Sequence, residues 1–358
     1  MNAIATETWL ALSRTRIGFG CRVLRSEEPF DELLAEVRRC VDHTVERLES
    51  TDRLRSAVRT LIALAPPEPA MVSVPLLVHR AETGCARPAV PVAAAHYLWW
   101  VAAHVFDDVI DHATTAYTEQ ITAEESVMAA VVCGSALPTR VLADGFDTST
   151  AVPVVTEFFW AWIHSNEGQL LDVAGKPGTA SSQDVLNTYR RKNGAPYGMA
   201  CALAARVAGV DDRQVARWRE FGVLLGMFGQ FRNDQEDVAS SRDEDLRNQT
   251  ATYLLTHLLD SAEDPDGRAD LVQLVDQAPH SDAARNGLHS RLLHADHLRG
   301  YLARVAELRG EVYAALHATG RTGGAVRALE GFVEQAAEPV GPFALGLAAD
   351  GANGTAVP

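Results

Sequence analysis

Two clusters of oxygen-bearing side chains follow long apolar segments of the 358-residue sequence. The first is DDVID at residues 107–111, directly after AVPVAAAHYLWWVAAHVF, and the second is NDQED at residues 233–237, close behind FGVLLGMFGQF. Residues four positions apart on a helix share a face. Because like charges at that spacing repel, the pattern favours a cation between the carboxylates. Mg²⁺ is commonly held by such carboxylates together with substrate phosphates.

The two clusters together predict one metal site. If the helices that carry them face each other, the clusters form two rims of a pocket, in which metal ions neutralise a diphosphate as a leaving group. Taken alone, either cluster could instead be a solvated helix end that carries surface acids. The predicted metal ligands are Asp107, Asp108, Asp111, Asn233, Asp234 and Asp237.

Composition narrows the classes of partner. The formal net charge of −15 argues against binding to nucleic acid or to anionic membranes, so an anionic substrate needs metal ions or local bases.

Five scattered cysteines suggest neither a zinc site nor a disulfide framework. The N-terminal segment lacks the build of a signal peptide. His96 and His104 interrupt the apolar run at 89–106, which favours a buried core helix. We therefore expect a cytoplasmic protein without a membrane span.

Helical periodicity dominates the chain, and strand signals are scarce. We expect one all-α domain over residues 1–340 and a disordered tail over 341–358. APPEPA at 65–70 breaks the pattern, 134–153 is expected to be a loop, and 261–287 a polar surface excursion. Gly194 and Pro196 predict a break in a helix. Helices are expected within 30–50, 51–64, 89–106, 154–175, 184–209, 211–238, 245–260 and 288–336.

The sequence resembles the trans-isoprenyl diphosphate synthase (polyprenyl synthetase) family over roughly residues 70–260. DDVID matches the first aspartate-rich motif of that family, and GQFRNDQED matches the second, with Asn233 in place of the usual leading Asp. EGQLLD (167–172) resembles its glycine–glutamine motif, and YRRKNGAPYGMACALAA (189–205) its lysine-bearing segment. TGCARP (83–88) resembles its basic motif, and DEDLRNQTATYLL (243–255) its last motif.

The resemblance implies an isoprenoid synthase-type helical bundle around a central pocket. It further implies an allylic isoprenyl diphosphate as substrate and Mg²⁺ as cofactor, with three ions present when substrate is bound. The long apolar helices favour a homodimer. Lys192 falls where a diphosphate-binding lysine is expected. The catalytic residues implied in this way are Asp107, Asp108, Asp111, Lys192 and Asp234.

The departures from the family concern a second diphosphate site, which chain elongation needs for isopentenyl diphosphate. The lysine expected in the basic motif is Gly84, and Arg87 remains. Trp100 stands where the family commonly has His or Gln, the arginines expected after the first motif are absent, and the lysine of the last motif is Thr250. Each lost charge-assisted contact costs about 1.5–3 kcal/mol. We therefore expect ionisation of an allylic diphosphate without elongation.

An allylic cation in a dry pocket can cyclise, lose a proton or be captured by a nucleophile, and aromatic faces stabilise it. For any single aromatic residue, plain core packing is the competing interpretation. Ala103 leaves room for a chain of fifteen or twenty carbons, so farnesyl and geranylgeranyl diphosphates are the expected substrates. The predicted substrate-binding residues are Arg87, Trp99, Trp100, Ala103, Phe159, Trp162, Gln169, Phe228, Gln230, Phe231 and Arg232.

Four functional hypotheses follow. The first is terpene synthase-type chemistry, in which the carbocation cyclises or is quenched. The second is prenyl transfer to an acceptor other than isopentenyl diphosphate, and the third is ordinary elongation by a polyprenyl diphosphate synthase with bases supplied from elsewhere in the chain. The fourth is a non-catalytic partner subunit. Retention of the aspartates argues against the fourth, and Asn233 can still ligate a metal through its carbonyl oxygen.

Overall fold

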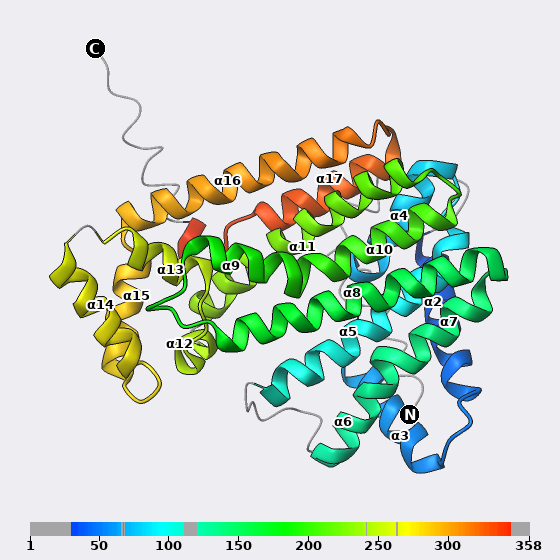
Figure 1. Ribbon diagram of the computed structural model, residues 1–358, viewed down its shortest axis with the longest axis horizontal. Helices are drawn as coiled ribbons and strands as arrows, with labels where there is room; N and C mark the ends of the chain where they lie inside the picture. The colour runs from blue at the N-terminus through cyan, green and yellow to red at the C-terminus, as the bar shows by residue number, and fades with distance from the viewer. Residues whose placement is uncertain are drawn as a thin grey trace. The chain divides into compact units, whose positions relative to one another are not determined.

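The computed structural model describes residues 30–65, 67, 69–110, 120–240, 242–262 and 264–344, and every regular element in these ranges is a helix (Figure 1). This confirms the predicted all-α class. Turns of other helical types are η1 (Arg87–Ala89), η3 (Val132–Ala136) and η4 (Arg190–Gly194). The α-helices are α2 (Phe30–Glu46), α3 (Asp52–Leu64), α4 (Pro69–Thr83), α5 (Val90–Ile110), α6 (Ala123–Val131), α7 (Leu137–Gly145), α8 (Thr148–Ala174), α9 (Ser182–Tyr189), α10 (Ala195–Val207), α11 (Asp212–Ser240), α12 (Glu244–Asn248), α13 (Tyr253–Asp260), α14 (Pro265–Gln277), α15 (Asp282–Leu292), α16 (Ala295–Ala318) and α17 (Gly324–Ala337).

A sequence interpretation of local structure was wrong at 134–153. The expected loop at 134–153 is helical, because Pro138 falls in the first turn of α7, where its missing N–H costs no hydrogen bond. The excursion at 261–287 contains α14 and most of α15, which begin at side-chain N-caps from Asp264 and Ser281. Most of the expected tail lies outside the described residues.

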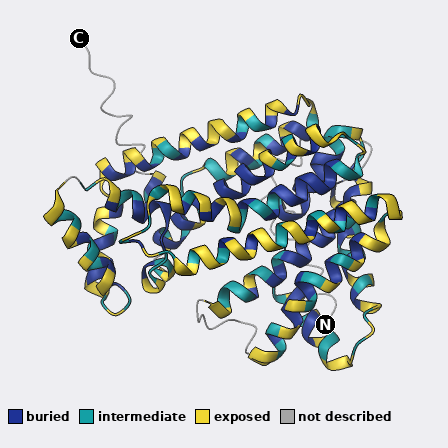
Figure 2. Cartoon of the chain, viewed as in Figure 1, coloured by how far each residue is buried: buried dark blue, intermediate teal, exposed yellow. Residues whose placement is uncertain are grey.

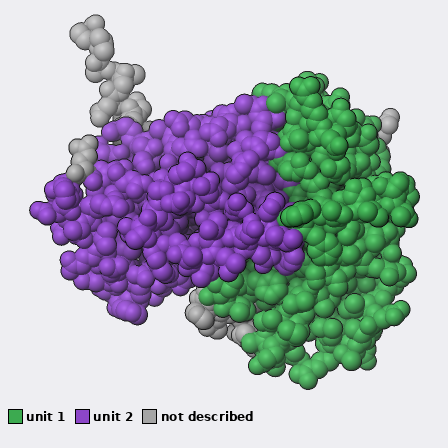
Figure 3. Space-filling view, viewed as in Figure 1, with its two compact units in different colours: residues 1–160, 199–219, 316–332 green, residues 161–198, 220–315, 333–358 purple. Residues whose placement is uncertain are grey.

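The chain divides into two compact units (Figure 3). Unit 1 comprises residues 1–160, 199–219 and 316–332, and unit 2 comprises residues 161–198, 220–315 and 333–358. Helices α8, α10, α11, α16 and α17 each contribute residues to both units, so the division follows no linker. The single domain over 1–340 stays a prediction.

Helix α5 forms the centre of unit 1, where it contacts α2, α4, α6 and α7. Arg87–Ile110 and Ala123–Gly145 are long and apolar enough to cross a membrane by composition alone. However, 72% of the apolar window of the first segment is buried inside the protein (Figure 2). Packing within the core therefore accounts for its apolar character.

A buried histidine fixes the packing of α5 in unit 1. The His96 Nδ1 atom lies 2.7 Å from the Met71 carbonyl oxygen, and the Trp100 Nε1–H group donates to His96 Nε2 at 3.0 Å. A carbonyl oxygen only accepts, so Nδ1 carries the proton of the neutral ring and Nε2 is the acceptor. Burial lowers the pKa of His96 to about 4.

We predict that His96 makes the free energy of unfolding depend on pH. Its pKa rises from about 4 in the folded chain to about 6.5 on unfolding, so its stabilising contribution is complete above pH 6.5 and is lost as the pH falls toward 4. In a His96→Gln variant, the amide can replace both hydrogen bonds without titrating. Urea denaturation from pH 7 to pH 5 should show the wild type losing about 2 kcal/mol relative to this variant. A pH-independent difference would contradict the prediction, and exposed His43→Gln controls for loss of an imidazole.

Candidate functional site

The first acidic cluster occupies the C-terminal turn of α5 in unit 1. Asp107 and Asp108 are partly buried there, and Asp111 lies outside the described residues. Trp99 is buried two turns earlier and Trp100 is partly buried. The predicted placement of carboxylates at the end of a buried helix is therefore confirmed for Asp107 and Asp108, whereas their role as ligands stays a prediction.

The second acidic cluster lies in α11 within unit 2. Asp234 and Asp237 have exposed fractions of 1% and 3%, whereas Asn233 is exposed. Neighbouring helical residues are rotated by about 100°, so Asn233 occupies a different face from Asp234. The two aspartates therefore form the buried part of this motif.

Two further carboxylates act on the second cluster, and neither was among the predicted ligands. Asp172 at the end of α8 raises the pKa of Asp234 and of Asp245 in α12, and the charges of Asp234 and Asp237 raise the pKa of Asp245 as well. Their sequence signal was present, since Asp172 closes EGQLLD and Asp245 lies within DEDLRNQTATYLL. Spacing alone could not show that these segments meet Asp234.

The electrostatics of this cluster are those of crowded, buried acids. Burial, with smaller contributions from Asp172 and Asp237, raises the pKa of Asp234 to about 7. Burial, and then the charges of Asp234, Asp237 and Asp172, raise the pKa of Asp245 well above its usual range. The Lys192 ammonium, whose Nζ lies 2.7 Å from Asp172 Oδ2, acts in the opposite direction on Asp245. More positive charge would stabilise the ionised cluster.

A chain of hydrogen bonds holds Asp234 in one orientation. The Tyr189 hydroxyl donates to Oδ2, and Gln230 Nε2 donates to Oδ1 at 2.8 Å. Asn193 in turn donates to Gln230 Oε1 at 2.5 Å. The backbone N–H of Tyr253 donates to the Tyr189 hydroxyl at 2.8 Å, which directs the phenolic proton toward Asp234.

Asp237 is held by the turn that follows α11. Its carboxylate oxygens accept from the backbone N–H groups of Glu244 and Asp245 at 3.2 and 3.3 Å. The turn reverses at Asp243, which has φ of 56° and accepts from His289 Nε2 at 2.6 Å. The first turn of α12 therefore presents its N–H groups to Asp237, which stabilises the negative charge.

Lys192 lies in the π-helical turn η4, and close backbone packing holds that turn in place. A Cβ atom on Gly168 of α8 would lie 2.3 Å from the Lys192 nitrogen, and one on Gly226 of α11 would lie 2.3 Å from the Asn193 carbonyl oxygen. These positions require glycine. The predicted helix break was wrong, because η4 continues directly into α10 and Pro196 falls in its first turn. Single π-helical turns are frequent at functional sites.

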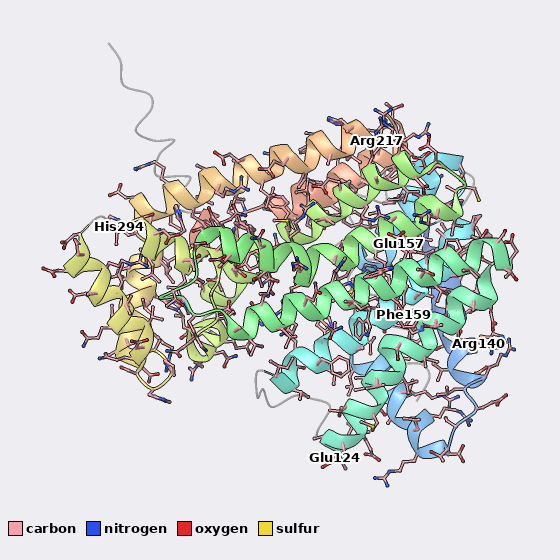
Figure 4. The ribbon with its side chains drawn as sticks, viewed as in Figure 1. Glu124, Arg140, Glu157, Phe159, Arg217 and His294 are labelled. Atoms are coloured by element: carbon pink, nitrogen blue, oxygen red, sulfur yellow. The ribbon has the colours of Figure 1, made fainter. Side chains whose placement is uncertain are left out.

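Some predicted substrate-binding residues lie in the core or on the surface of their unit. Phe228 and Phe231 are buried, and the Phe231 ring packs edge-on against Tyr189 at 5.6 Å. Arg232 bonds to Glu236 at 2.9 Å and to backbone carbonyls of the C-terminal segment, which is a structural role. Phe159 is 41% exposed and follows the ion-paired Glu157 of α8 closely (Figure 4). Ala103, Trp162 and Gln169 are partly buried, and their roles stay predictions.

The basic motif of unit 1 offers little free positive charge. Arg87 Nη1 lies 2.9 Å from Glu36 Oε1, so this guanidinium is already paired with a carboxylate. Gly84 has φ of +83° and follows the last residue of α4, with its N–H bonded to the Arg80 carbonyl at 2.8 Å. A lysine there would be strained, because only glycine adopts this conformation at little cost.

The donor set of unit 2 fits divalent cations that are shared with a diphosphate. Among the described residues, no group of three or more His, Cys, Asp or Glu side chains is arranged to hold a metal ion by itself. Mg²⁺ commonly takes one or two carboxylates and completes its shell with water and phosphate oxygens. The crowded carboxylates around Asp234 supply such ligands, and a cation would relieve the repulsion that raises their pKa values.

We predict that Tyr189→Phe weakens metal binding. The hydroxyl orients Asp234, and loss of a group that orients a ligand typically costs 10–100-fold in metal affinity. Titration of the full chain with Mn²⁺, followed by electron paramagnetic resonance, should show an affinity about tenfold lower. Tyr253→Phe is the matched control, because its backbone N–H rather than its hydroxyl contacts this chain of hydrogen bonds. Equal affinities in Tyr189→Phe and wild type would refute the orienting role.

Comparison with known proteins agrees with this geometry. The sequence model of the polyprenyl synthetase family matches residues 71–288. A geranylgeranyl pyrophosphate synthase structure is 16% identical with a TM-score of 0.76, covering 87% of this chain and 99% of that chain. A Caulobacter crescentus CB15 polyprenyl synthase, complexed with calcium and isoprenyl diphosphate, is 19% identical with a TM-score of 0.76, covering 89% and 97%. A Rhodobacter capsulatus decaprenyl diphosphate synthase is 19% identical with a TM-score of 0.74, covering 86% and 98%. No curated protein matches the sequence.

The chain therefore belongs to the polyprenyl synthetase family, and its fold is that of the isoprenyl diphosphate synthases. Membership places it among the prenyltransferase enzymes of isoprenoid biosynthesis, which synthesise isoprenyl diphosphates or transfer isoprenyl groups.

Proposed function

We propose that this enzyme ionises an allylic isoprenyl diphosphate, farnesyl or geranylgeranyl, with Mg²⁺ and without elongating it. The resulting carbocation cyclises or is quenched, as in a terpene synthase. The observation that carries the proposal is a contrast between the residues expected to bind the allylic diphosphate and those expected to bind isopentenyl diphosphate. The acidic cluster and Lys192 are retained, whereas Arg87 is paired with Glu36 and the other expected bases are replaced.

Each retained residue has a role in the proposed ionisation. Bound Mg²⁺ supplies the positive charge that makes the diphosphate a leaving group. Asp107, Asp108 and Asp111 in one motif, and Asn233, Asp234 and Asp237 in the other, are the candidate ligands. We assign the three ions expected with bound substrate to these residues.

Lys192 binds the diphosphate directly in this proposal. The Lys192 ammonium now contacts Asp172, and it can exchange that partner for a diphosphate oxygen. Gln230 and Tyr189 keep Asp234 oriented while charge develops on the leaving group. Because these donors are already in place, little reorganisation accompanies bond cleavage.

Elongation is disfavoured by electrostatics. A second diphosphate carries two to three negative charges, and its binding would need several charge-assisted contacts. Arg87 would have to leave Glu36, and Gly84, Trp100 and Thr250 offer no positive charge. Ordinary elongation and a non-catalytic subunit are therefore weaker candidates.

Prenyl transfer to an acceptor other than isopentenyl diphosphate is the second candidate. Trp100 favours it, because an indole two helical turns before the first acidic cluster suits an apolar or aromatic acceptor. Both candidates share the same ionisation step and differ only in what captures the cation.

We predict that hydrocarbon or alcohol products form from geranyl, farnesyl or geranylgeranyl diphosphate with Mg²⁺ alone. Mass spectrometry with and without isopentenyl diphosphate would identify them. Asp107→Ala should lower the rate about 100-fold or more, because charge stabilisation at the leaving group is lost. Removal of Mg²⁺ with a chelator should stop the reaction. Longer diphosphates formed only when isopentenyl diphosphate is present would overturn the proposal.

We also propose a cytoplasmic homodimer that uses the exposed face of α8. This helix is exposed over much of its length (Figure 2). Contiguous apolar surface of this kind marks an interaction site. Among its exposed apolar side chains are Val152, Phe159, Trp160, Ile163, Leu170, Leu171 and Val173.

We predict that Trp160→Glu combined with Ile163→Glu yields a monomer, because two charges would have to be buried at the interface. Light scattering coupled to gel filtration would measure the mass. His43→Glu places a charge at an exposed position on α2 and should leave the dimer intact. A monomeric wild type at micromolar concentration would exclude this interface.

A further inference from the structure

A series of rings runs along one face of α5 toward the first acidic cluster. His96, Trp100 and His104 follow one another at intervals of four residues, and Asp108 is the next in the series. Each step advances about 6 Å along the helix axis on nearly the same face. The ring centroids of Trp100 and His104 are 5.6 Å apart with an interplanar angle of 37°.

His96 determines how the Trp100 indole is presented. Its Nδ1–H group donates to the Met71 carbonyl, and its Nε2 atom accepts the indole N–H at 3.0 Å. His96 is fully buried, so it stays neutral at ordinary pH and Nε2 remains an acceptor. The N–H group of Trp100 is therefore turned toward the core of unit 1.

This orientation leaves an aromatic surface on α5, two helical turns before the acidic cluster. Indole has one polar group, the Nε1–H, and it is already engaged. The Trp99 ring packs edge-on against Trp100 at 5.0 Å and 85°, which further limits how the indole can rotate. The partly exposed part of Trp100 can stack on another π system or stabilise a cation, and it has no donor to offer a diphosphate.

We infer that Trp100 is the specificity-determining residue of an acceptor subsite on α5, two helical turns before Asp107 and Asp108, and that this subsite takes a neutral aromatic acceptor rather than a second diphosphate. His96 is its positioning residue. The inference rests on the proposed function, because an acceptor matters only where an allylic diphosphate is ionised. It develops the second candidate, prenyl transfer to an acceptor other than isopentenyl diphosphate, which shares the ionisation step.

The transfer balances without a further reactant. The allylic C–O bond breaks, and both of its electrons leave with the diphosphate. A ring carbon of the acceptor supplies the electron pair for the new C–C bond. The proton on that carbon passes to the released diphosphate, which restores the aromatic ring. The products are the prenylated aromatic compound and protonated diphosphate.

The test is direct binding of two probes to the full chain with Mg²⁺ and farnesyl thiodiphosphate, an analogue that ionises poorly. Isothermal titration calorimetry would measure 2-naphthol, a neutral aromatic, and isopentenyl diphosphate. We expect the wild type to bind 2-naphthol and to show no binding of isopentenyl diphosphate. Trp100→Gln should weaken 2-naphthol binding at least tenfold and leave the thiodiphosphate affinity unchanged, whereas Trp100→Phe should stay within threefold of wild type.

The positioning role of His96 has its own readout. His96→Gln keeps an acceptor for the indole N–H and should retain 2-naphthol binding. His96→Leu removes that acceptor and should weaken binding as Trp100→Gln does, with a change in the near-ultraviolet circular dichroism of the Trp99–Trp100 pair.

Equal 2-naphthol affinities in wild type and Trp100→Gln would overturn the inference, as would wild-type binding of isopentenyl diphosphate. Failure of the proposed function is visible separately. Release of inorganic diphosphate from farnesyl diphosphate, measured on the same preparations, reports ionisation whether or not an aromatic compound binds.

Discussion

Unit 2 depends on one physical constraint, which is the burial of several carboxylates close to one another. Asp172, Asp234, Asp237 and Asp245 come from three helices, and burial together with the charges of their neighbours raises the pKa values of Asp234 and Asp245. Such a cluster is unfavourable unless hydrogen bonds and positive charge compensate it. Tyr189, Gln230 and the N–H groups of α12 supply the hydrogen bonds, and Lys192 supplies one charge. Divalent cations bound with a diphosphate would compensate the negative charge that remains.

The backbone around Lys192 follows from the same requirement. Lysine and asparagine side chains can reach the acidic cluster from η4 only if the neighbouring helices approach that turn closely. Gly168 and Gly226 permit this approach, because a Cβ atom at either position would overlap the backbone of η4. The π-helical turn thus places Lys192 near Asp172 and Asn193 near Gln230 at once. The π-helical irregularity of the backbone therefore positions these two side chains.

In unit 1, by contrast, the residues before the first acidic cluster offer little positive charge to a second anion. Arg87 is paired with Glu36, and the segment of α5 before Asp107 presents rings rather than bases. The hydrogen bond from Trp100 to His96 turns the only polar group of the indole inward. An anionic second substrate would find few partners on these residues, whereas a neutral aromatic molecule could stack. The family fold is kept, and the proposed change in chemistry comes from a few side chains.

The sequence by itself determined the all-α class and the helical placement of the described residues of both acidic motifs. These features depend on local periodicity and on short spacings, which residues close together in the sequence determine. It failed at 134–153, where Pro138 begins a helix rather than interrupting one. The contributions of Asp172, Asp245 and Tyr189, the Arg87–Glu36 pair and the His96–Met71 bond were decided only by the tertiary structure. Their partners are separated by 8 to 73 positions in the chain, so no local pattern encodes the contact, and packing alone brings them together.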